Sequence, residues 1–370
     1  MIDADAFAAL LCDWCLEPAS GDQVLVSTTT LAAPLAVALH RALLGRGAWA
    51  LLRLAPHGLE SDFFELASDA QLDGFAPFEL VEARSVDAAL RIDAPANVRQ
   101  LAGIDPARIS RAALARRPIQ EARLARRWCG TLWPTSALAQ QAGMSDREYA
   151  AFVVRALFLD RPDPVDAWRE LSAHQQRLVE RLSGAREVRI EGEGTDLRLR
   201  VEGRTWINSD GRRNMPSGEV FTGPHESSAE GTIRFTVPSN QRGAEVVGVE
   251  LTFRAGAVVA ARADRGEDYL QAALARDPGA RLLGELGIGT NPGIARATGS
   301  TLLDEKIAGT VHLALGRSYP ETGGANASAL HWDLICDLRA GGQLSADGEA
   351  IVRDGTIAGE GDGTSQPLAP

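Results

Sequence analysis

Cysteine is scarce in this chain of 370 residues: there are four, at positions 12, 15, 129 and 336, too few for a disulfide framework. No apolar run approaches the ~20 residues that are needed to cross a bilayer, so no membrane partner is expected. The first ten residues contain two aspartates and no basic side chain, which is unlike a secretory signal. These features together predict a cytoplasmic protein.

Basic residues are too few to balance the acidic ones, and the formal net charge is −11. Because so acidic a surface repels phosphates, we expect no nucleic-acid partner.

Lys306 is the only lysine among 38 basic residues. Where arginine stands everywhere else, a remaining lysine either marks a place that requires a compact ammonium group or has survived by chance.

Cys12 and Cys15 have the C-x-x-C spacing of a redox motif or of half a zinc site. They fall inside the apolar helical pattern of Ala4–Leu16, and no second cysteine pair follows at metal-binding spacing. We therefore predict that both are small core residues of a helix.

The first part of the chain alternates between strand and helix patterns. An apolar run at Gln23–Val26, a helical pattern at Leu31–Leu44 and a second apolar run at Ala48–Leu54 predict a βαβ unit in a parallel sheet. Phe78–Ala83 and Ala88–Ile92 predict further short strands. Because no glycine-rich phosphate loop follows the first strand, dinucleotide binding is not expected.

Residues 105–184 are predicted to be mostly helical. Ser145 and Glu148 have the spacing of a capping box, which predicts a helix start. A further helix is expected to begin at Pro164 and to end at Leu182, before Gly184. Residues 1–184 are therefore expected to form an N-terminal α/β domain with a helical extension.

From residue 185 the pattern changes to short, branched or alternating runs between turns, and residues 185–358 are expected to form a β-rich mixed domain that carries the chemistry. Helical patterns interrupt it at Glu267–Arg276, Arg281–Leu286 and Leu302–Ile307. Residues 359–370 are expected to be a disordered tail. The predicted fold class is thus α/β plus α+β, a βαβ-type parallel-sheet domain followed by a β-rich catalytic domain.

Two histidines stand out in this second domain. In a strand, His331 and Asp333 would point to the same face while Trp332 points to the other, and the pair is either half of a metal site or a histidine oriented by a carboxylate. His312 would share its face with Thr310 and small residues, so it is either a core histidine or a ligand with room for an ion.

Two glutamates lie among apolar residues and glycines. Glu219 follows a tight turn, and Glu285 lies in the run Leu283–Gly289. A buried carboxylate is costly unless a positive charge pairs with it, so each residue is either in a surface loop or beside a cation.

The charges of these residues suit two cations. Three carboxylates, two neutral histidines, two divalent ions and a bridging hydroxide together have no net charge, whereas one ion would leave the site negative. A set with no cysteine suits Zn, Co, Mn or Mg. Glu305 is either a sixth ligand, with Lys306 balancing its charge, or a solvated residue at a helix end. Tyr319 either donates to a developing oxyanion or forms an aromatic lid.

The motifs at residues 214–224, 284–291, 304–312, 318–324 and 331–333 resemble the metalloaminopeptidases typified by aminopeptidase T and aminopeptidase S. The resemblance implies a two-domain homodimer that uses two divalent ions to release N-terminal residues from peptides with a free N-terminus. It implies the following metal ligands, with Tyr319 as the active-site tyrosine: Glu219, Glu285, Glu305, His312, His331 and Asp333.

The mechanism that the resemblance implies is attack by a metal-bridging hydroxide, with Glu285 between the ions and Tyr319 at the oxyanion. The sequence does not assign the general base, for which Glu219 and an outer carboxylate such as Glu226 are the candidates. An alternative remains, because His312, His331 and Asp333 alone would suit the mononuclear Fe(II) of a ring-opening dioxygenase of the dihydroxypyridine type. The additional presence of Glu219 and Glu285 favours two metals, and the intact set disfavours a non-catalytic protein.

Overall fold

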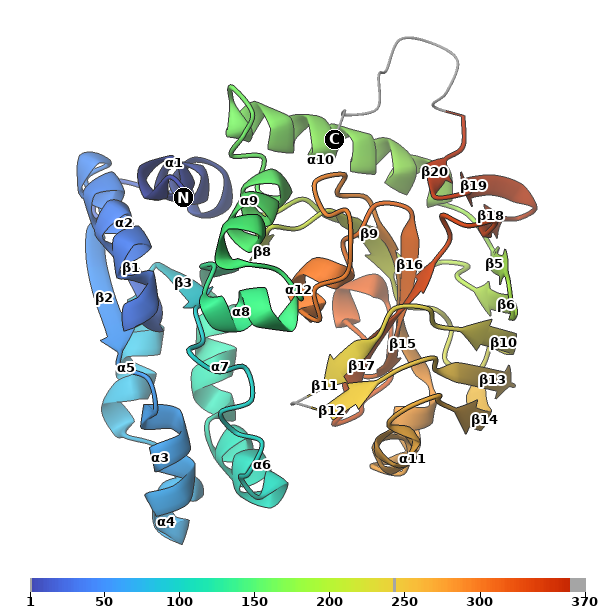
Figure 1. Cartoon of the computed structure of the whole chain (residues 1–370), viewed down its shortest axis with the longest axis horizontal. Coiled ribbons are helices and arrows are strands. Elements are labelled where there is room, and N and C mark those ends of the chain that lie inside the picture. Colours follow the sequence, from blue (N-terminus) through green and yellow to red (C-terminus); the bar gives the residue numbers. More distant parts are fainter. Residues whose placement is uncertain (1, 242–243, 360–370) are drawn as a thin grey trace. The chain divides into compact units, whose positions relative to one another are not determined.

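The computed structural model describes residues 2–241 and 244–359, and the chain divides into two compact units (Figure 1). The first unit extends to Trp168 and also includes Gly211–Pro216, and the second comprises Arg169–Asp210 and the chain from Ser217 onward. The units thus divide inside helix α10 (Pro164–Leu182), whereas the domain boundary after residue 184 stays a prediction. The predicted tail lies, from residue 360 onward, outside the described residues.

The first unit contains a sheet of five parallel strands in the order β2-β1-β3-β4-β8. The predicted βαβ unit is confirmed, because β1 and β2 pair in parallel and α2 connects them. Its strands are β1 (Gln23–Thr29), β2 (Trp49–Ala55), β3 (Ala88–Asp93), β4 (Arg127–Leu132) and β8 (Asn214–Met215).

Helices occupy most of the remaining chain of this unit. They are α1 (Ala4–Leu10), the π-helix η1 (Leu11–Leu16), the 3-10 helix η2 (Thr30–Ala32), α2 (Ala33–Gly45), α3 (Leu59–Leu66), α4 (Asp69–Leu72), α5 (Pro77–Ser85), α6 (Pro106–Ala115), α7 (Arg117–Leu124), α8 (Ser136–Gln141) and α9 (Asp146–Ala156). The capping box is confirmed, since Ser145 and Glu148 cap each other at the start of α9. Cys12 and Cys15 are buried in η1, as predicted.

One prediction for this unit is wrong. Phe78–Ala83 is part of helix α5, and Phe78 is 66% exposed, so the run is not a buried strand. A short apolar run does not distinguish a strand from a helix, and Pro77 in the first helical turn favours the helix. Residues 105–184 are mostly helical, as predicted, and strand β4 interrupts the helices.

The second unit is built from antiparallel sheets, which confirms the predicted β-rich half. An eight-stranded sheet has the order β14-β13-β10-β6-β5-β18-β19-β20, and a five-stranded sheet has the order β17-β16-β15-β9-β7. The first sheet comprises β5 (Glu187–Gly192), β6 (Thr195–Arg200), β10 (Glu230–Arg234), β13 (Glu250–Arg254), β14 (Ala257–Arg262), β18 (Gln343–Ala346), β19 (Glu349–Arg353) and β20 (Thr356–Ile357).

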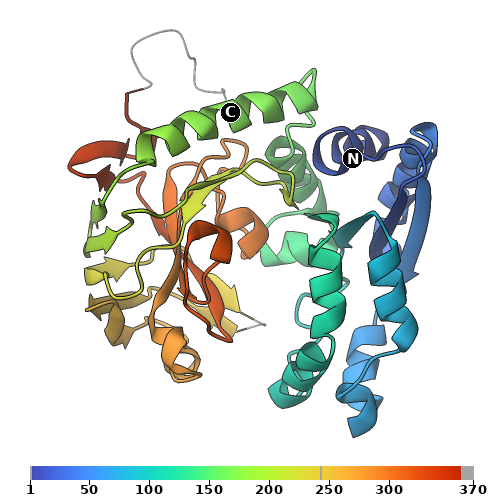
Figure 2. The same ribbon diagram turned by 180° about the vertical axis from the view of Figure 1, so that it is seen from behind.

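The five-stranded sheet comprises β7 (Ile207–Ser209), β9 (Glu219–Thr222), β15 (Leu283–Gly289), β16 (Thr310–Gly316) and β17 (His331–Asp337). Strands β11 (Ser239–Gln241) and β12 (Ala244–Val246) form a separate hairpin. Besides most of α10, the helices of this unit are short: α11 (Glu267–Leu274), η3 (Pro278–Arg281), α12 (Thr301–Asp304) and η4 (Pro320–Thr322). Helix α11 packs against β14 and β12, at the lower end of this unit in both views (Figures 1 and 2).

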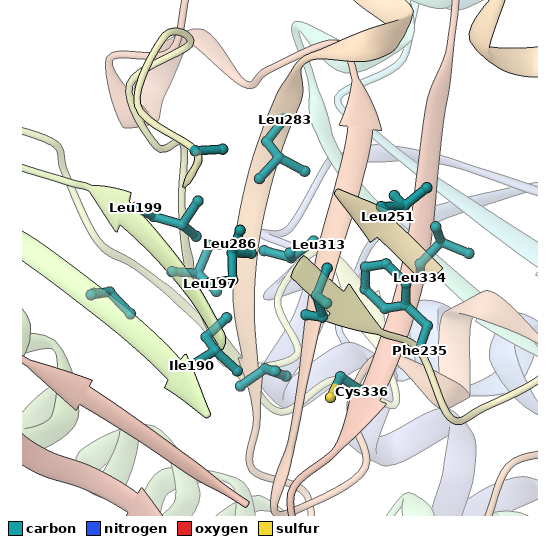
Figure 3. Close-up of a cluster of buried hydrophobic side chains, with 14 of the residues drawn as sticks. Ile190, Leu197, Leu199, Phe235, Leu251, Leu283, Leu286, Leu313, Leu334 and Cys336 are labelled. Atoms are coloured by element: carbon teal, nitrogen blue, oxygen red, sulfur yellow. The ribbon is translucent and has the colours of Figure 1, made fainter. Parts of the chain in front are cut away.

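One face of the five-stranded sheet supplies the core of the second unit. Leu286 of β15, Leu313 of β16 and Leu334 of β17 lie in one buried cluster, and Figure 3 shows them beside leucines and an isoleucine of the other sheet. Because side chains alternate along a strand, the residues next to these leucines point to the opposite face. That face carries Glu285, His312 and Asp333, so the hydrophobic core fixes where the polar side chains point.

The predicted helical pattern at Arg281–Leu286 is wrong, because 3-10 helix η3 ends at Arg281 and β15 follows. A register shift between Leu283 and Glu285 interrupts the alternation of side chains that is expected of a strand. The spacing of the apolar residues therefore resembles that of a helix. Helix α11 confirms the first predicted pattern, and α12 is shorter than the third. Among the described residues, the structure contains no helix with the length and apolar character needed to cross a membrane.

Candidate metal centre

Four neighbouring strands bring acidic and histidine side chains to one face of the five-stranded sheet. Ala314 of β16 is paired with both Glu285 of β15 and Asp333 of β17, and His312 is paired with Gly287. Glu219 of β9 is paired with Gly289 at the other edge of β15. The register therefore places residues far apart in sequence side by side.

These side chains are buried, with His312 0%, Glu219 5%, Glu285 5% and Asp333 8% exposed. The reading of the two glutamates as surface-loop residues is therefore wrong. The strand pairing explains their burial, because β9 and β15 both lie inside the sheet. His331 is partly exposed at the start of β17.

Glu285 lies between the two histidines. His312 Nε2 is 3.3 Å from Glu285 Oε1 and 3.3 Å from Glu219 Oε2, while His331 Nε2 is 3.6 Å from Glu285 Oε2 and 3.6 Å from Asp333 Oδ1. Each carboxylate oxygen of Glu285 thus faces a different imidazole. This is the arrangement in which one carboxylate can contact two ions.

Three overlapping groups of side chains could each hold an ion, because within each group the ligand atoms lie within 4.8 Å of one another. The groups share Glu285, His312 and Asp333, so that each of these residues belongs to two of them. The groups are Glu219, Glu285 and His312; Glu285, His331 and Asp333; and Glu305, His312 and Asp333. The sequence-predicted set is therefore brought together in one cluster, Glu305 included.

Lys306 is buried in this cluster, with a side chain 1% exposed. Its Nζ donates to Glu219 Oε1 at 2.7 Å and also to the Glu305 carboxylate. Burial alone would lower the pKa of Lys306, but these two carboxylates raise it, so the ammonium group is charged. The same charge offsets the burial of Glu305 and lowers its pKa, which is unlike a solvated residue at a helix end.

Some polar atoms of the cluster have no hydrogen-bond partner. Glu219 Oε2 and Asp333 Oδ1 are buried and accept no hydrogen bond, although a buried carboxylate oxygen normally has a donor. Burial is the main cause that raises the pKa of Glu219, of Glu285 and, to about 6, of Asp333. A cation would satisfy these oxygens, so the residues present fit a metal.

Both histidines face Glu285 through Nε2, and a hydrogen bond holds one of them in this orientation. His331 Nδ1 lies 2.8 Å from the Arg317 carbonyl oxygen and donates to it, which leaves Nε2 as an electron-pair donor facing the carboxylates. Nδ1 of His312 is buried and has no hydrogen-bond partner. Both imidazoles thus face Glu285 through Nε2.

Tyr319 follows β16 in the loop before β17. Its ring lies 5.2 Å from that of His331 and 5.7 Å from that of Phe221, measured between ring centroids. Burial and the nearby carboxylates raise the pKa of Tyr319, so the phenol is protonated and can donate a hydrogen bond.

Glu226, the other candidate for the general base, belongs to none of the three groups that could hold an ion. Its carboxylate contacts Arg204 and the Ala325 amide.

Sequence reasoning missed two residues that support the cluster. Gln175 of α10 is fully buried, and its amide donates to the backbone oxygens of Ser209 and Glu219, which fixes β9 beside β7. Asp304, next to Glu305, accepts hydrogen bonds from Thr298, although burial raises its pKa to about 6. No local signal identifies a glutamine on an amphipathic helix as buried, so only the structure reveals this contact.

A family model described as thermophilic metalloprotease (M29) matches residues 3–357. Aminopeptidase 2 of Geobacillus stearothermophilus is 33% identical over 341 residues, 78% of this chain and 82% of the relative. Aminopeptidase T of Thermus thermophilus is 32% identical over 257 residues, 60% of each chain. The solved structure of wild-type AmpT from Thermus thermophilus is 25% identical, with a TM-score of 0.84 over 96% of this chain and 98% of that chain.

A more distant likeness is confined to the fold. The structure of 2,5-dihydroxypyridine dioxygenase from Pseudomonas putida has a TM-score of 0.60 over 96% of each chain, with 15% sequence identity. The architecture of both units is therefore shared with proteins of different chemistry, and the activity has to be argued from the site.

Replacing Gly287 by alanine should weaken metal binding. A Cβ atom at this position would lie 2.1 Å from Cε1 and Nε2 of His312, so the imidazole has to leave its place. We expect affinity for Zn²⁺ or Mn²⁺ to fall at least ~10-fold, measured by calorimetry and by ions retained after gel filtration. Gly45→Ala is the control, since nothing lies within 4 Å of its added Cβ. Unchanged ion content in Gly287→Ala would contradict the placement of His312.

Replacing Lys306 by methionine should destabilise the metal-free protein by about 3 kcal/mol, because two buried carboxylates lose their common partner. The measurement is urea unfolding in the presence of a chelator. Arg111→Met is the matched control: it removes an exposed cation that also contacts two carboxylates, and should cost no more than ~1 kcal/mol. Equal costs for the two variants would show that Lys306 is not the charge on which the cluster depends.

Proposed function

The chain belongs to the thermophilic metalloprotease family (M29) and is a peptide hydrolase, and we propose that it releases N-terminal residues from peptides with two divalent ions. The observation that carries this proposal is the overlap of three potential ion-binding groups on one sheet face. Because Glu285 presents one oxygen to each histidine, the cluster supports two neighbouring ions better than one central ion.

The residues divide into two sides around Glu285. Glu219 and His312 would hold an ion on one side, His331 and Asp333 on the other, and Glu305 is the sixth ligand. A set of carboxylates and imidazoles suits Zn, Co, Mn or Mg. When bound, such a pair lowers the pKa of a shared water and polarises a carbonyl group.

The protein's own groups then orient and stabilise the reacting peptide. Tyr319, which is protonated and lies beside His331, is placed to donate a hydrogen bond to the oxyanion that develops on the scissile carbonyl. For the general base we retain Glu219, because it lies in the cluster. Glu226 is set aside, because both of its oxygens accept hydrogen bonds elsewhere.

A free α-amine gives the substrate a group that the cluster can recognise, and this is the basis of the preference for a free N-terminus that we propose. The buried carboxylates Glu219, Glu285 and Asp333, or one of the two ions, would bind this amine. The interior of a peptide offers no amine at the scissile bond. The substrates are therefore peptides with an unblocked N-terminus.

The alternative, an Fe(II) dioxygenase that uses His312, His331 and Asp333, is supported by the fold likeness alone. Within the described residues, each group that can hold an ion contains one histidine rather than two. Glu219, Glu285 and Glu305 also lie in the same cluster, and a mononuclear iron would leave their charges uncompensated.

Replacing Glu285 by glutamine should abolish peptide hydrolysis, because the bridging carboxylate becomes a neutral amide that cannot serve two ions. We expect turnover of an aminoacyl-p-nitroanilide to fall by more than about 100-fold and bound ions to fall from two per chain. Glu250→Gln, which changes a glutamate paired with Arg262 in β14, is the control. Near-normal turnover in Glu285→Gln would refute the bridging role. Oxygen uptake with a dihydroxypyridine, and no peptide turnover, would favour the dioxygenase.

We further propose a cytoplasmic homodimer. No disulfide joins the four cysteines, all of which are buried, and this supports a reducing compartment. An apolar surface at the edge of the first unit supports the dimer: β2 is an edge strand, and Trp49 is 63% exposed on it. Leu51 and Leu52 of β2 are also exposed, and so are four apolar residues of the helices in this unit: Val37 and Leu44 of α2, and Phe78 and Val81 of α5.

A second copy suits this edge because an open strand edge is complementary to itself across a two-fold axis. One partner of a standard interface buries ~800 Å², and the exposed apolar side chains at this edge would contribute to such an area. Replacing Leu51 and Leu52 by lysine should therefore give a monomer in light scattering, with turnover per chain retained. Val259→Lys, on an exposed apolar residue of the other unit, is the control. A wild-type monomer, or a dimer that survives the change, would refute this interface.

A further inference from the structure

The loop that carries Tyr319 is held by a salt bridge that has no contact with the candidate metal ligands. We propose that Arg204 and Glu226 are positioning residues, which hold this loop, residues 317–326, so that the Tyr319 hydroxyl meets the oxyanion. This inference rests on the proposed peptidase function and assigns a role to two residues outside the metal cluster.

Glu226 connects Arg204 to the loop. Glu226 Oε2 accepts a hydrogen bond from Arg204 Nη2 at 2.8 Å, and its Oε1 accepts one from the Ala325 amide at 2.7 Å. The side chain of Arg204 is 7% exposed and that of Glu226 is 27% exposed. Burial would raise the pKa of Glu226, but the Ala325 amide and Arg204 lower it below its usual range, so the pair is ionic at neutral pH.

A second connection runs through the neighbouring residue of the same segment. The Thr205 amide donates to the Thr322 carbonyl oxygen at 3.1 Å. Thr322 in turn donates to the Tyr319 carbonyl oxygen, through its amide at 3.1 Å and through its hydroxyl at 2.7 Å. Arg204 also packs against the loop, since a Cβ at Gly323 would lie 3.6 Å from its side chain. The segment at Arg204 thus determines where the Tyr319 backbone lies.

The base of the loop is closed independently of this salt bridge. The Ser318 amide donates to the Asn326 carbonyl oxygen at 3.0 Å, and the Asn326 side chain donates to the backbone oxygens of Gly279 and Gly316. These contacts fix the two ends of the loop. The tip between them, which includes the turn at Pro320–Thr322, is held from outside by Arg204, Thr205 and Glu226.

Tyr319 needs such support because its two aromatic contacts are both edge-to-face. Its packing partners are Phe221 and His331, at centroid distances of 5.7 and 5.2 Å. Aromatic contacts of this kind allow the ring to slide, whereas a hydrogen bond to a transition state tolerates displacements well below ~1 Å. Holding the loop backbone restricts the hydroxyl to one place.

The first test compares Glu226→Gln and Arg204→Met with the wild type. A glutamine amide placed against the Arg204 guanidinium brings two donors together, so the tip should loosen without loss of folding. We expect kcat for an aminoacyl-p-nitroanilide to fall about 10-fold, with KM and the number of bound ions unchanged. Glu250→Gln, which removes a comparable contact with Arg262, is the control and should leave kcat unchanged.

The second test distinguishes a positioning role from a general structural one. In a Tyr319→Phe background, Glu226→Gln should cause no further loss of kcat, because the group on which it acts is absent. Hydrogen exchange of residues 317–326, followed by mass spectrometry, should become faster in Glu226→Gln and not in Glu250→Gln. An additive loss of kcat, or unchanged exchange, would overturn the inference. A wild type without peptidase activity would defeat the proposed function instead, while the exchange measurement would still test the contact with the loop.

Discussion

The main physical constraint on the second unit is that four carboxylates lie close together in one cluster: Glu219, Glu285, Glu305 and Asp333. Removing one charge from water costs several kcal/mol unless an opposite charge is close. Lys306 is the only permanent cation that contacts these groups within the described residues, and it reaches two of them. The remaining carboxylates face imidazoles, which are neutral when they bind metal. Without an ion, the carboxylates raise the pKa of His312 to about 9, and yet Glu219 Oε2 and Asp333 Oδ1 still lack a hydrogen-bond donor. These two oxygens are the physical reason to assign the cluster a metal.

The fold makes so costly a cluster possible because it separates the two faces of one sheet. Leu286, Leu313 and Leu334 lie in the core, and their burial fixes the strand registers with no help from the polar residues. Moving any of these strands by one residue would expose its leucine and turn its ligand away from the cluster. The hydrophobic core thus supplies the free energy that positions the charged residues, and small residues such as Gly287 leave the space they need.

The features of the fold and the site that could be predicted from the sequence are those that depend on residues close together in the chain. Strand alternation is local, so the shared face of His331 and Asp333 and the small neighbours of His312 were predictable. The stretch around Glu285 was read as helical because a register shift disturbs its pattern. The contact between Lys306 and Glu219 spans 87 residues and depends on sheet order, for which the chain has no local signal. Its identity as the only lysine left both a required ammonium group and chance survival open, and the structure supplies the partners.

The choice of lysine over arginine at position 306 follows from the geometry of this contact. An ammonium group is a compact donor that can bond two carboxylates at one point, whereas a guanidinium is a broad planar fork that pairs best with one carboxylate edge-on. Lys306 engages Glu219 Oε1 and leaves Oε2 facing His312, 3.3 Å away. A bidentate arginine would occupy both oxygens of Glu219 and so remove it as a ligand. In a chain that otherwise uses only arginine, the lysine is retained because it neutralises a carboxylate without covering it.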